Sequence, residues 1–149
     1  MSGPVEHVIN RLNWAPGPWD EEPDRLEWRT GVGYPGLIVR GQLGALCGYA
    51  GLPPGHPCHG IGYEDVPSIE VHGGLTYGDA CQGPVCHVPS PGEPDDVWWL
   101  GFDCAHYLDC VPGMTPMYMR SDRGLVYRDV EYVRNEVEAL ARQLWERRG

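Results

Sequence analysis

Four stretches of the chain have the hydrophobic pattern of β-strands. Residues 37–40 form a short β-branched run between two glycines, and residues 43–52 alternate loosely and are interrupted by glycines. Residues 69–72 alternate apolar with polar side chains, and the run resumes at 75–77 after two further glycines. Residues 97–106 are the most strongly apolar run and predict a central strand. Together these runs predict a sheet of about four strands.

The period changes near the C-terminus. From Asp129 onward, apolar side chains recur every three or four residues, at Val130, Val133, Val137, Leu140 and Leu144. Asp129 is a residue type that caps helices, Glu131 suits the first turn, and arginines occupy the last turn. We expect an amphipathic helix over 129–147. Since strands and helices do not alternate, the predicted class is α+β: an antiparallel sheet with this helix packed on one face and long loops rich in Gly and Pro.

The remaining segments are expected to be irregular. Residues 1–30 carry Trp14, Trp19 and Trp28 among prolines and acidic residues, and we interpret them as an arm that wraps the body of the protein. Residues 78–96, with several prolines and acids, predict a long surface loop. A length of 149 residues corresponds to one domain, over 1–149.

Charge and composition exclude several classes of function. The net charge is −10, and all eleven basic residues are arginine. An acidic chain disfavours nucleic acid as a partner, and without lysine neither a P-loop nor Schiff-base chemistry can be built. No apolar run is long enough to span a membrane and no signal sequence is evident, so we expect no membrane partner and a cytoplasmic location.

The six cysteines allow two interpretations. In a secreted protein they would form a disulfide framework, whereas in a reducing cytosol Cys47 and Cys104 are expected to be small core residues. Cys81 and Cys86, followed by His87, lie in a segment rich in Gly and Pro and are the candidates for a metal site. Their C-x4-C spacing is looser than that of a usual zinc knuckle.

Histidines and carboxylates gather where the predicted strands end. Glu70 and His72 are two residues apart and share one face of a strand, and the glycines Gly73 and Gly74 would let a ligand approach the backbone. His56 lies on a rigid turn between Gly55 and Pro57 and is expected at the same rim.

The end of the last predicted strand leaves a choice open. If the strand continues, Cys104 and His106 share a face and Asp103 points the other way; if it stops at Phe102, all three can converge. Imidazoles with a carboxylate support general acid–base hydrolysis, with His72, His106, Asp103 and Glu70 as the catalytic candidates, or they ligate a divalent metal. The structural alternative is that His72 and His106 are hydrogen-bonded strand-end histidines and that Asp103 caps a turn. Tyr77 and Trp99 are candidates for stacking on a ligand, with a core role as the alternative for Trp99.

Four motifs resemble a known family. GLPPGHP at 51–57, VHGGLTY at 71–77, WWLGFDCAH at 98–106 with Asp109 after it, and YRDVEYV at 127–133 resemble small proteins encoded by tailed bacteriophages and prophages. The similarity spans about residues 40–144. It implies a phage accessory protein that acts in the infected cytoplasm, and it makes His56, His72, Asp103 and His106 motif positions.

Three functions remain open at this point. A phage protein of this kind suits a role against host defence, where small cyclic or ADP-ribose-type nucleotides are signals, so the expected ligand is a small nucleotide. The first function is phosphodiesterase-like hydrolysis by His72 and His106. The second is sequestration of the nucleotide without chemistry, by stacking on Tyr77 or Trp99 and by arginine contacts. The third is inhibition of a protein partner through the acidic surface. A local cluster of Arg40, Arg120, Arg123 or Arg128 would have to offset the net charge for an anionic ligand, and oligomerisation is left open.

Overall fold

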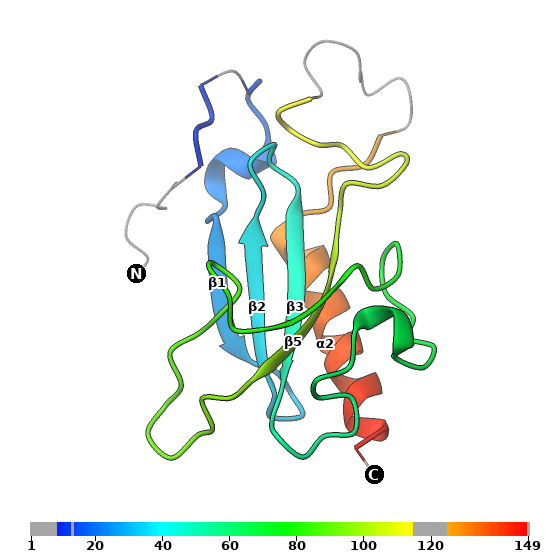
Figure 1. Cartoon of the computed structure of the whole chain (residues 1–149). Coiled ribbons are helices and arrows are strands. Elements are labelled where there is room, and N and C mark those ends of the chain that lie inside the picture. The colour runs from blue at the N-terminus through cyan, green and yellow to red at the C-terminus, as the bar shows by residue number, and fades with distance from the viewer. Residues whose placement is uncertain (1–8, 13, 115–124, 149) are drawn as a thin grey trace.

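The fold is a five-stranded antiparallel sheet with one long helix on one face (Figure 1). It is seen in a computed structural model that describes residues 9–12, 14–114 and 125–148. The strand order is β1-β2-β3-β5-β4, and the elements are, in chain order, η1 Pro18–Glu21, β1 Arg25–Arg29, β2 Pro35–Arg40, β3 Leu46–Leu52, η2 Tyr63–Asp65, β4 Tyr77–Ala80, β5 Trp98–Asp103 and α2 Val130–Glu146. This confirms the α+β class, with five strands where about four were expected.

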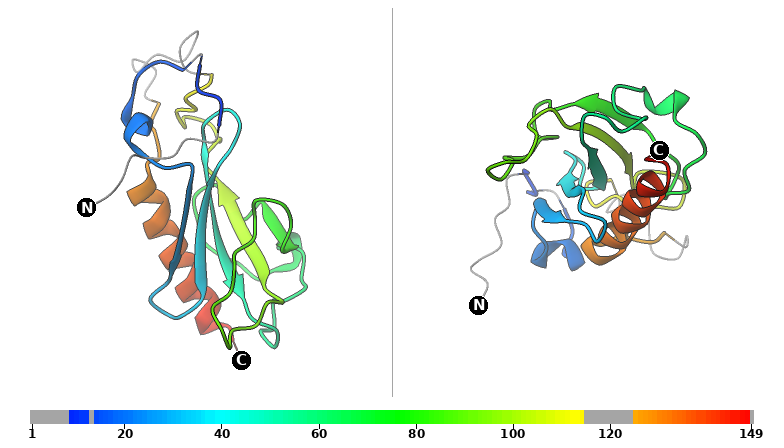
Figure 2. Two further views of the ribbon diagram at one scale, coloured as in Figure 1. Left: turned by 90° about the vertical axis from the view of Figure 1, so that its left-hand side faces the viewer. Right: turned by 90° about the horizontal axis from the view of Figure 1, so that it is seen from below.

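Helix α2 forms as its periodicity predicts. Its N-cap is Asp129, whose carboxylate accepts a hydrogen bond from the backbone N–H of Tyr132 at 2.8 Å. One stripe of the helix is buried, consisting of Val133, Val137, Leu140, Ala141 and Leu144. Figure 2 shows the helix lying along one face of the curved sheet, where it packs mainly on β2 and β3. No helix in the described part of the chain has the length and apolarity of a membrane span.

The sheet separates two hydrophobic clusters. On the helix side, residues such as Ile38, Leu100 and Phe102 pack with the buried stripe of α2. Gly48 permits the close approach, because a Cβ there would overlap Phe102 and Val137. On the opposite face lies a smaller cluster formed by Leu37, Tyr49, Val85, Val97 and Trp99. The sheet is therefore covered on both faces, which accounts for the apolar character of β3 and β5.

The expected strand at residues 69–72 is wrong. Ile69 and Val71 do point to the core, but they pack beside α2 and not within the sheet. The backbone N–H and C=O of Glu70 hydrogen-bond to the side-chain amide of Gln143, and the N–H of His72 donates to Glu136. Because helix side chains satisfy this backbone, the segment alternates like a strand without joining one. The strand begins only at Tyr77 and takes up the start of the expected 78–96 loop.

Two other segments differ from the expectation. The arm over residues 1–30 was expected to be irregular, yet Arg25–Arg29 form the edge strand β1, which pairs with β2. Glu22, one of the acidic residues of this arm, is partly buried and accepts a hydrogen bond from the N–H of Val130 at 2.8 Å. The arm is thus tied to the start of α2 by a carboxylate placed at the positive end of the helix.

Candidate functional site

Three segments meet near the N-terminal end of α2 and bring six polar side chains together. The segments are residues 70–76, the end of β5 with the turn after it, and the start of the helix. We call these side chains the histidine cluster: His72, Asp103, His106, Asp109, Arg128 and Tyr132. Because β5 ends at Asp103, the chain is free to turn there, and the side chains of Asp103 and His106 converge. The sequence had left this choice open.

His72 is held at both ring nitrogens. Its Nε2 lies 2.8 Å from Oδ2 of Asp109, and its Nδ1 lies 2.9 Å from the hydroxyl of Tyr132. If Asp109 is ionised, Nε2 carries a proton and donates it to the carboxylate. Nδ1 then accepts from the Tyr132 hydroxyl when the ring is neutral, or donates to it when the ring is charged. A proton can therefore move along the hydrogen bond between Tyr132 and His72, while Asp109 holds the other side of the ring.

Asp109 is the anchor of the cluster. Its carboxylate is buried, and it accepts from His72, from the backbone N–H of His106 at 3.0 Å and from Nε of Arg128 at 3.0 Å. Burial by itself raises the pKa of Asp109, but the hydrogen bonds from these three donors outweigh it, so the pKa lies below the ordinary value. The turn that aims the carboxylate inward contains Leu108 at φ 71°, a strained conformation for a residue with a side chain.

His106 lies beside His72 and next to a second carboxylate. The two ring centroids are 5.8 Å apart, and Nε2 of His106 lies 3.2 Å from Oδ1 of Asp103, without the alignment of a hydrogen bond. Asp103 in turn accepts from the hydroxyl of Thr76 at 3.1 Å. Gly73 packs directly on the imidazole of His106, because a Cβ at this position would overlap the ring. Gly73 and Gly74 were expected to let a ligand approach the backbone. At Gly73 that space is occupied by the imidazole of His106.

Tyr132 was not predicted as a site residue, and Arg128 was named only among the arginines that could offset the net charge for an anionic ligand. The Arg128 guanidinium lies 4.9 Å from the centroid of the Tyr132 ring, a cation–π contact, while its Nε binds Asp109. Burial raises the pKa of Tyr132. Both residues lie within the YRDVEYV motif, which marked this segment in the sequence. Tyr132 lies outside the apolar stripe of α2, and the spacing of apolar residues could not indicate its hydrogen bond with His72.

Two predicted residues lie apart from the cluster. The side chain of Glu70 is exposed, and only its backbone is held. His56 is buried beside the C-terminal end of α2, where its Nδ1 accepts from the N–H of Cys58 at 2.9 Å. Its Nε2 therefore donates to the carbonyl oxygen of Leu144 at 2.7 Å. This histidine adds a second hydrogen bond to a carbonyl that also accepts from the N–H of Arg147 at the helix end, and its expected place at the rim of the site is wrong.

The two aromatic candidates belong to the hydrophobic cluster on the other face of the sheet. Trp99 is completely buried, which rules out stacking on a ligand and corrects that prediction. Tyr77 is half-buried and packs edge-to-face on Tyr49, with ring centroids 5.2 Å apart. Gly74 has φ +81°, which a glycine adopts without strain, and a Cβ at this position would have no atom within 4 Å. Gly74 therefore allows the turn and does not pack on His106 as Gly73 does.

The metal candidates are bonded to each other. Cys81 and Cys86 form a disulfide with a Cα–Cα distance of 4.6 Å, so neither offers a thiolate in this state. His87 packs edge-to-face on Trp99 at 5.2 Å, and burial lowers its pKa. Among residues 9–12, 14–114 and 125–148, no group of three or more His, Cys, Asp or Glu side chains is arranged to hold a metal ion. Cys104 is buried and its pKa is raised by burial, which disfavours a thiolate nucleophile.

Comparison of the chain with protein-family models, with curated proteins and with solved structures gave no match.

Proposed function

We propose that the histidine cluster is a general acid–base site and that the protein hydrolyses a phosphodiester bond in a small nucleotide. The observation that carries the proposal is the pair of imidazoles, His72 and His106, 5.8 Å apart with a carboxylate beside each. Hydrolysis needs one group that takes a proton from the attacking water and another that gives a proton to the leaving oxygen. Two adjacent imidazoles can divide these tasks.

His106 suits the role of base. Its side chain is 34% exposed, compared with 13% for His72. Because its Nε2 is buried beside Asp103, Nδ1 is the nitrogen that takes the proton from water. After it takes the proton, the Asp103 carboxylate at 3.2 Å stabilises the imidazolium.

Tyr132 and His72 suit the role of acid. The raised pKa of Tyr132 keeps the phenol protonated at neutral pH, which favours a proton donor over a nucleophile. When Tyr132 gives its proton to the leaving oxygen, a charged His72 replaces it from Nδ1, and the ionised Asp109 stabilises the charged ring beforehand. The water attacks phosphorus, the bond to the leaving oxygen breaks, and one proton has moved on each side.

Arg128 supplies a positive charge for the phosphate. Only its Nε is hydrogen-bonded within the described part of the chain, so its terminal nitrogens can reach an anion. Arg40 cannot serve this purpose, since it is buried and pairs with Asp24 through Nε at 2.9 Å. Arg120 and Arg123 lie outside the described residues.

A second function, sequestration without turnover, is favoured by a different observation. Both nitrogens of His72 are already bonded within the protein, so Arg128 and His106 could hold the nucleotide while His72 only orders the site. In either case the motif resemblance supplies the setting: an accessory protein of a phage that removes a host defence signal from the infected cytoplasm.

One experiment separates the two functions. The purified protein is incubated with cyclic di- and trinucleotides and with ADP-ribose derivatives, and the nucleotide is identified by mass spectrometry before and after heat denaturation. Conversion to a cleaved product that is lost in both His72→Ala and His106→Ala supports hydrolysis, whereas a nucleotide that disappears and returns intact on heating supports sequestration. His59→Ala is the matched control, because this histidine binds the carbonyl of Asp96 away from the cluster. An unchanged panel would contradict both functions.

A further inference from the structure

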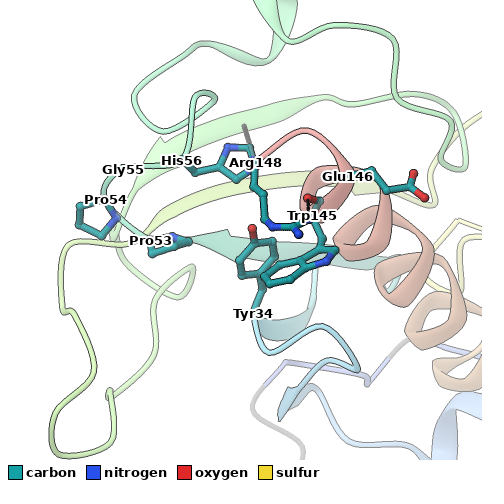
Figure 3. Close-up of a pocket in the computed structure, with 8 residues that line it drawn as sticks. All are labelled: Tyr34, Pro53, Pro54, Gly55, His56, Trp145, Glu146 and Arg148. Atoms are coloured by element: carbon teal, nitrogen blue, oxygen red, sulfur yellow. Dashed lines mark hydrogen bonds between the residues drawn. The ribbon is translucent and has the colours of Figure 1, made fainter.

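A pocket of about 850 Å³ opens at the C-terminal end of α2 (Figure 3). It is formed by Tyr34, the turn at residues 53–56, the end of α2 with Trp145 and Glu146, and Arg148 just after the helix. Tyr132 and Trp145 are separated by about 20 Å along the helix axis at 1.5 Å per residue. The pocket is therefore distinct from the histidine cluster.

Tyr34 presents its hydroxyl to this pocket. The residue is only 7% exposed, and its ring makes edge contacts with His56 at 6.1 Å and Trp145 at 5.8 Å. Its hydroxyl points toward the Arg148 guanidinium (Figure 3) and makes no hydrogen bond in the part of the chain that the structure describes. The ring is buried while the hydroxyl faces the pocket, so a ligand that bonds to the hydroxyl replaces water there.

Arg148 is a cation without a carboxylate partner among the described residues. Its guanidinium lies 3.8 Å from the centroid of the Trp145 ring, and one terminal nitrogen donates to the Trp145 carbonyl oxygen at 2.7 Å. The carboxylate of Glu146 points away from the other labelled side chains (Figure 3). The guanidinium is stacked on Trp145 and keeps N–H donors for an anion.

The other walls offer contact surface and not hydrogen bonds. Both nitrogens of His56 are bonded to the protein backbone, and Pro53 and Pro54 present only apolar edges. Trp145 is 38% exposed, which is unusual for so large an apolar side chain next to a cavity. A ligand here would find one cation, one hydroxyl and the apolar surfaces of Trp145 and the two prolines, with the carboxylate of Glu146 directed away from them.

We propose that this pocket binds a small ligand that carries an oxyanion next to a planar or apolar group. The oxyanion is held by Arg148 and by the hydroxyl of Tyr34, and the planar group lies against Trp145 and the proline turn. Nucleoside monophosphates and aromatic carboxylates share this chemistry. The site is independent of the proposed hydrolysis, so a negative result for one does not affect the other.

The test is isothermal titration calorimetry with four probes: adenosine monophosphate, adenosine, benzoate and inorganic phosphate. We expect saturable binding of adenosine monophosphate or benzoate with a Kd below about 1 mM, and binding at least about tenfold weaker for adenosine and for phosphate alone. If adenosine monophosphate binds and benzoate does not, the ligand class is a phosphate; the reverse outcome indicates a carboxylate. Arg148→Gln is expected to weaken binding about tenfold and Tyr34→Phe about fivefold.

Two controls keep the result interpretable. Arg134→Gln removes the same charge from an arginine that also stacks on a tryptophan, Trp28, but does not line the pocket, and it should leave the Kd unchanged. Far-UV circular dichroism and thermal unfolding establish that each variant is folded; Tyr34→Phe removes one oxygen atom only. Absence of binding by all four probes, or a Kd that neither Arg148→Gln nor Tyr34→Phe changes, would overturn the proposal.

Discussion

Nε2 of His72 lies 2.8 Å from Oδ2 of Asp109, and this hydrogen bond joins two segments that are 37 residues apart in the chain. The carboxylate is buried and also accepts from Arg128 and from the backbone of His106. One side chain therefore holds the turn after β5, the segment before β4 and the residue before the cap of α2. The order of the whole cluster depends on it.

Replacement of Asp109 by Asn should destabilise the protein by about 2–3 kcal/mol. The amide cannot accept from all three donors, and its NH2 group would face at least one of them. Urea unfolding monitored by circular dichroism measures the effect. Asp103→Asn is the matched control, because Asp103 is 34% exposed and should cost less than about 1 kcal/mol. Equal losses for the two variants would contradict the anchoring role.

The same carboxylate predicts a pH dependence of stability. The pKa of Asp109 in the folded protein lies below its ordinary value, since hydrogen bonds from His72, His106 and Arg128 outweigh the effect of burial. Between the folded and unfolded pKa values the unfolded chain binds more protons, so the free energy of unfolding rises with pH there. The contribution is complete above the ordinary carboxyl pKa and is lost as pH falls through the folded value.

This prediction is checked by urea unfolding from pH 6 down to about pH 3. The difference in free energy of unfolding between the natural protein and Asp109→Asn should shrink as pH falls below about 4. A difference that stays constant over this range would mean that Asp109 is not ionised in the folded state or contributes nothing through its charge.

Secondary structure was predictable where the spacing of apolar residues alone determines it. The stripe of α2 and the apolar run of β5 were both found, because each is buried along its length. Residues 69–72 show the limit: period two reports which side chains are buried, but not whether the backbone pairs with a strand or with helix side chains such as Gln143. In β1 the same alternation was present, with Leu26 and Trp28 half-buried, and it was obscured by the charged residues between them.

The site was predictable by residue type and less so by geometry. His72, Asp103 and His106 were grouped from the sequence, and the structure brings them together. Tyr132 and Arg128 join them only because the helix begins beside the turn after β5, a relationship that arises from tertiary packing. His56 has the same residue type and also lies in a motif, but the fold places it at the other end of α2.

His56 is expected to matter for stability and not for nucleotide turnover. His56→Ala removes one of the two hydrogen bonds to the carbonyl of Leu144 and leaves the N–H of Cys58 without its acceptor, at a cost of about 1–3 kcal/mol. Thermal unfolding and the nucleotide assay, performed below the melting temperature of the variant, measure the two properties. Loss of turnover in a fully folded variant would return His56 to the list of catalytic candidates.

The Cys81–Cys86 disulfide should make stability sensitive to reductant. The bond closes a short loop that contains Val85, which is buried on the face of the sheet opposite α2. For a loop of this size the constraint on the unfolded chain is worth about 2 kcal/mol. Addition of a phosphine reductant should lower the melting temperature of the natural protein and leave the double variant Cys81→Ser, Cys86→Ser unchanged. A reductant effect of the same size in both would locate it at the other cysteines.

Gly73 and Gly74 offer a test of the packing around His106 in which backbone strain is matched. Both residues have positive φ, at 71° and 81°, so a change to Ala strains the backbone at either position by about 1 kcal/mol. Only at Gly73 would the added Cβ overlap the imidazole of His106; at Gly74 there is nothing within 4 Å. Gly73→Ala should therefore displace His106, shift its ring resonances in NMR spectra and reduce any nucleotide turnover as strongly as His106→Ala does. Gly74→Ala should lose a similar amount of stability from strain but keep the His106 resonances and the turnover. If both variants behave alike, contact with Gly73 does not position His106, and the ring is held by Asp103 and the turn alone.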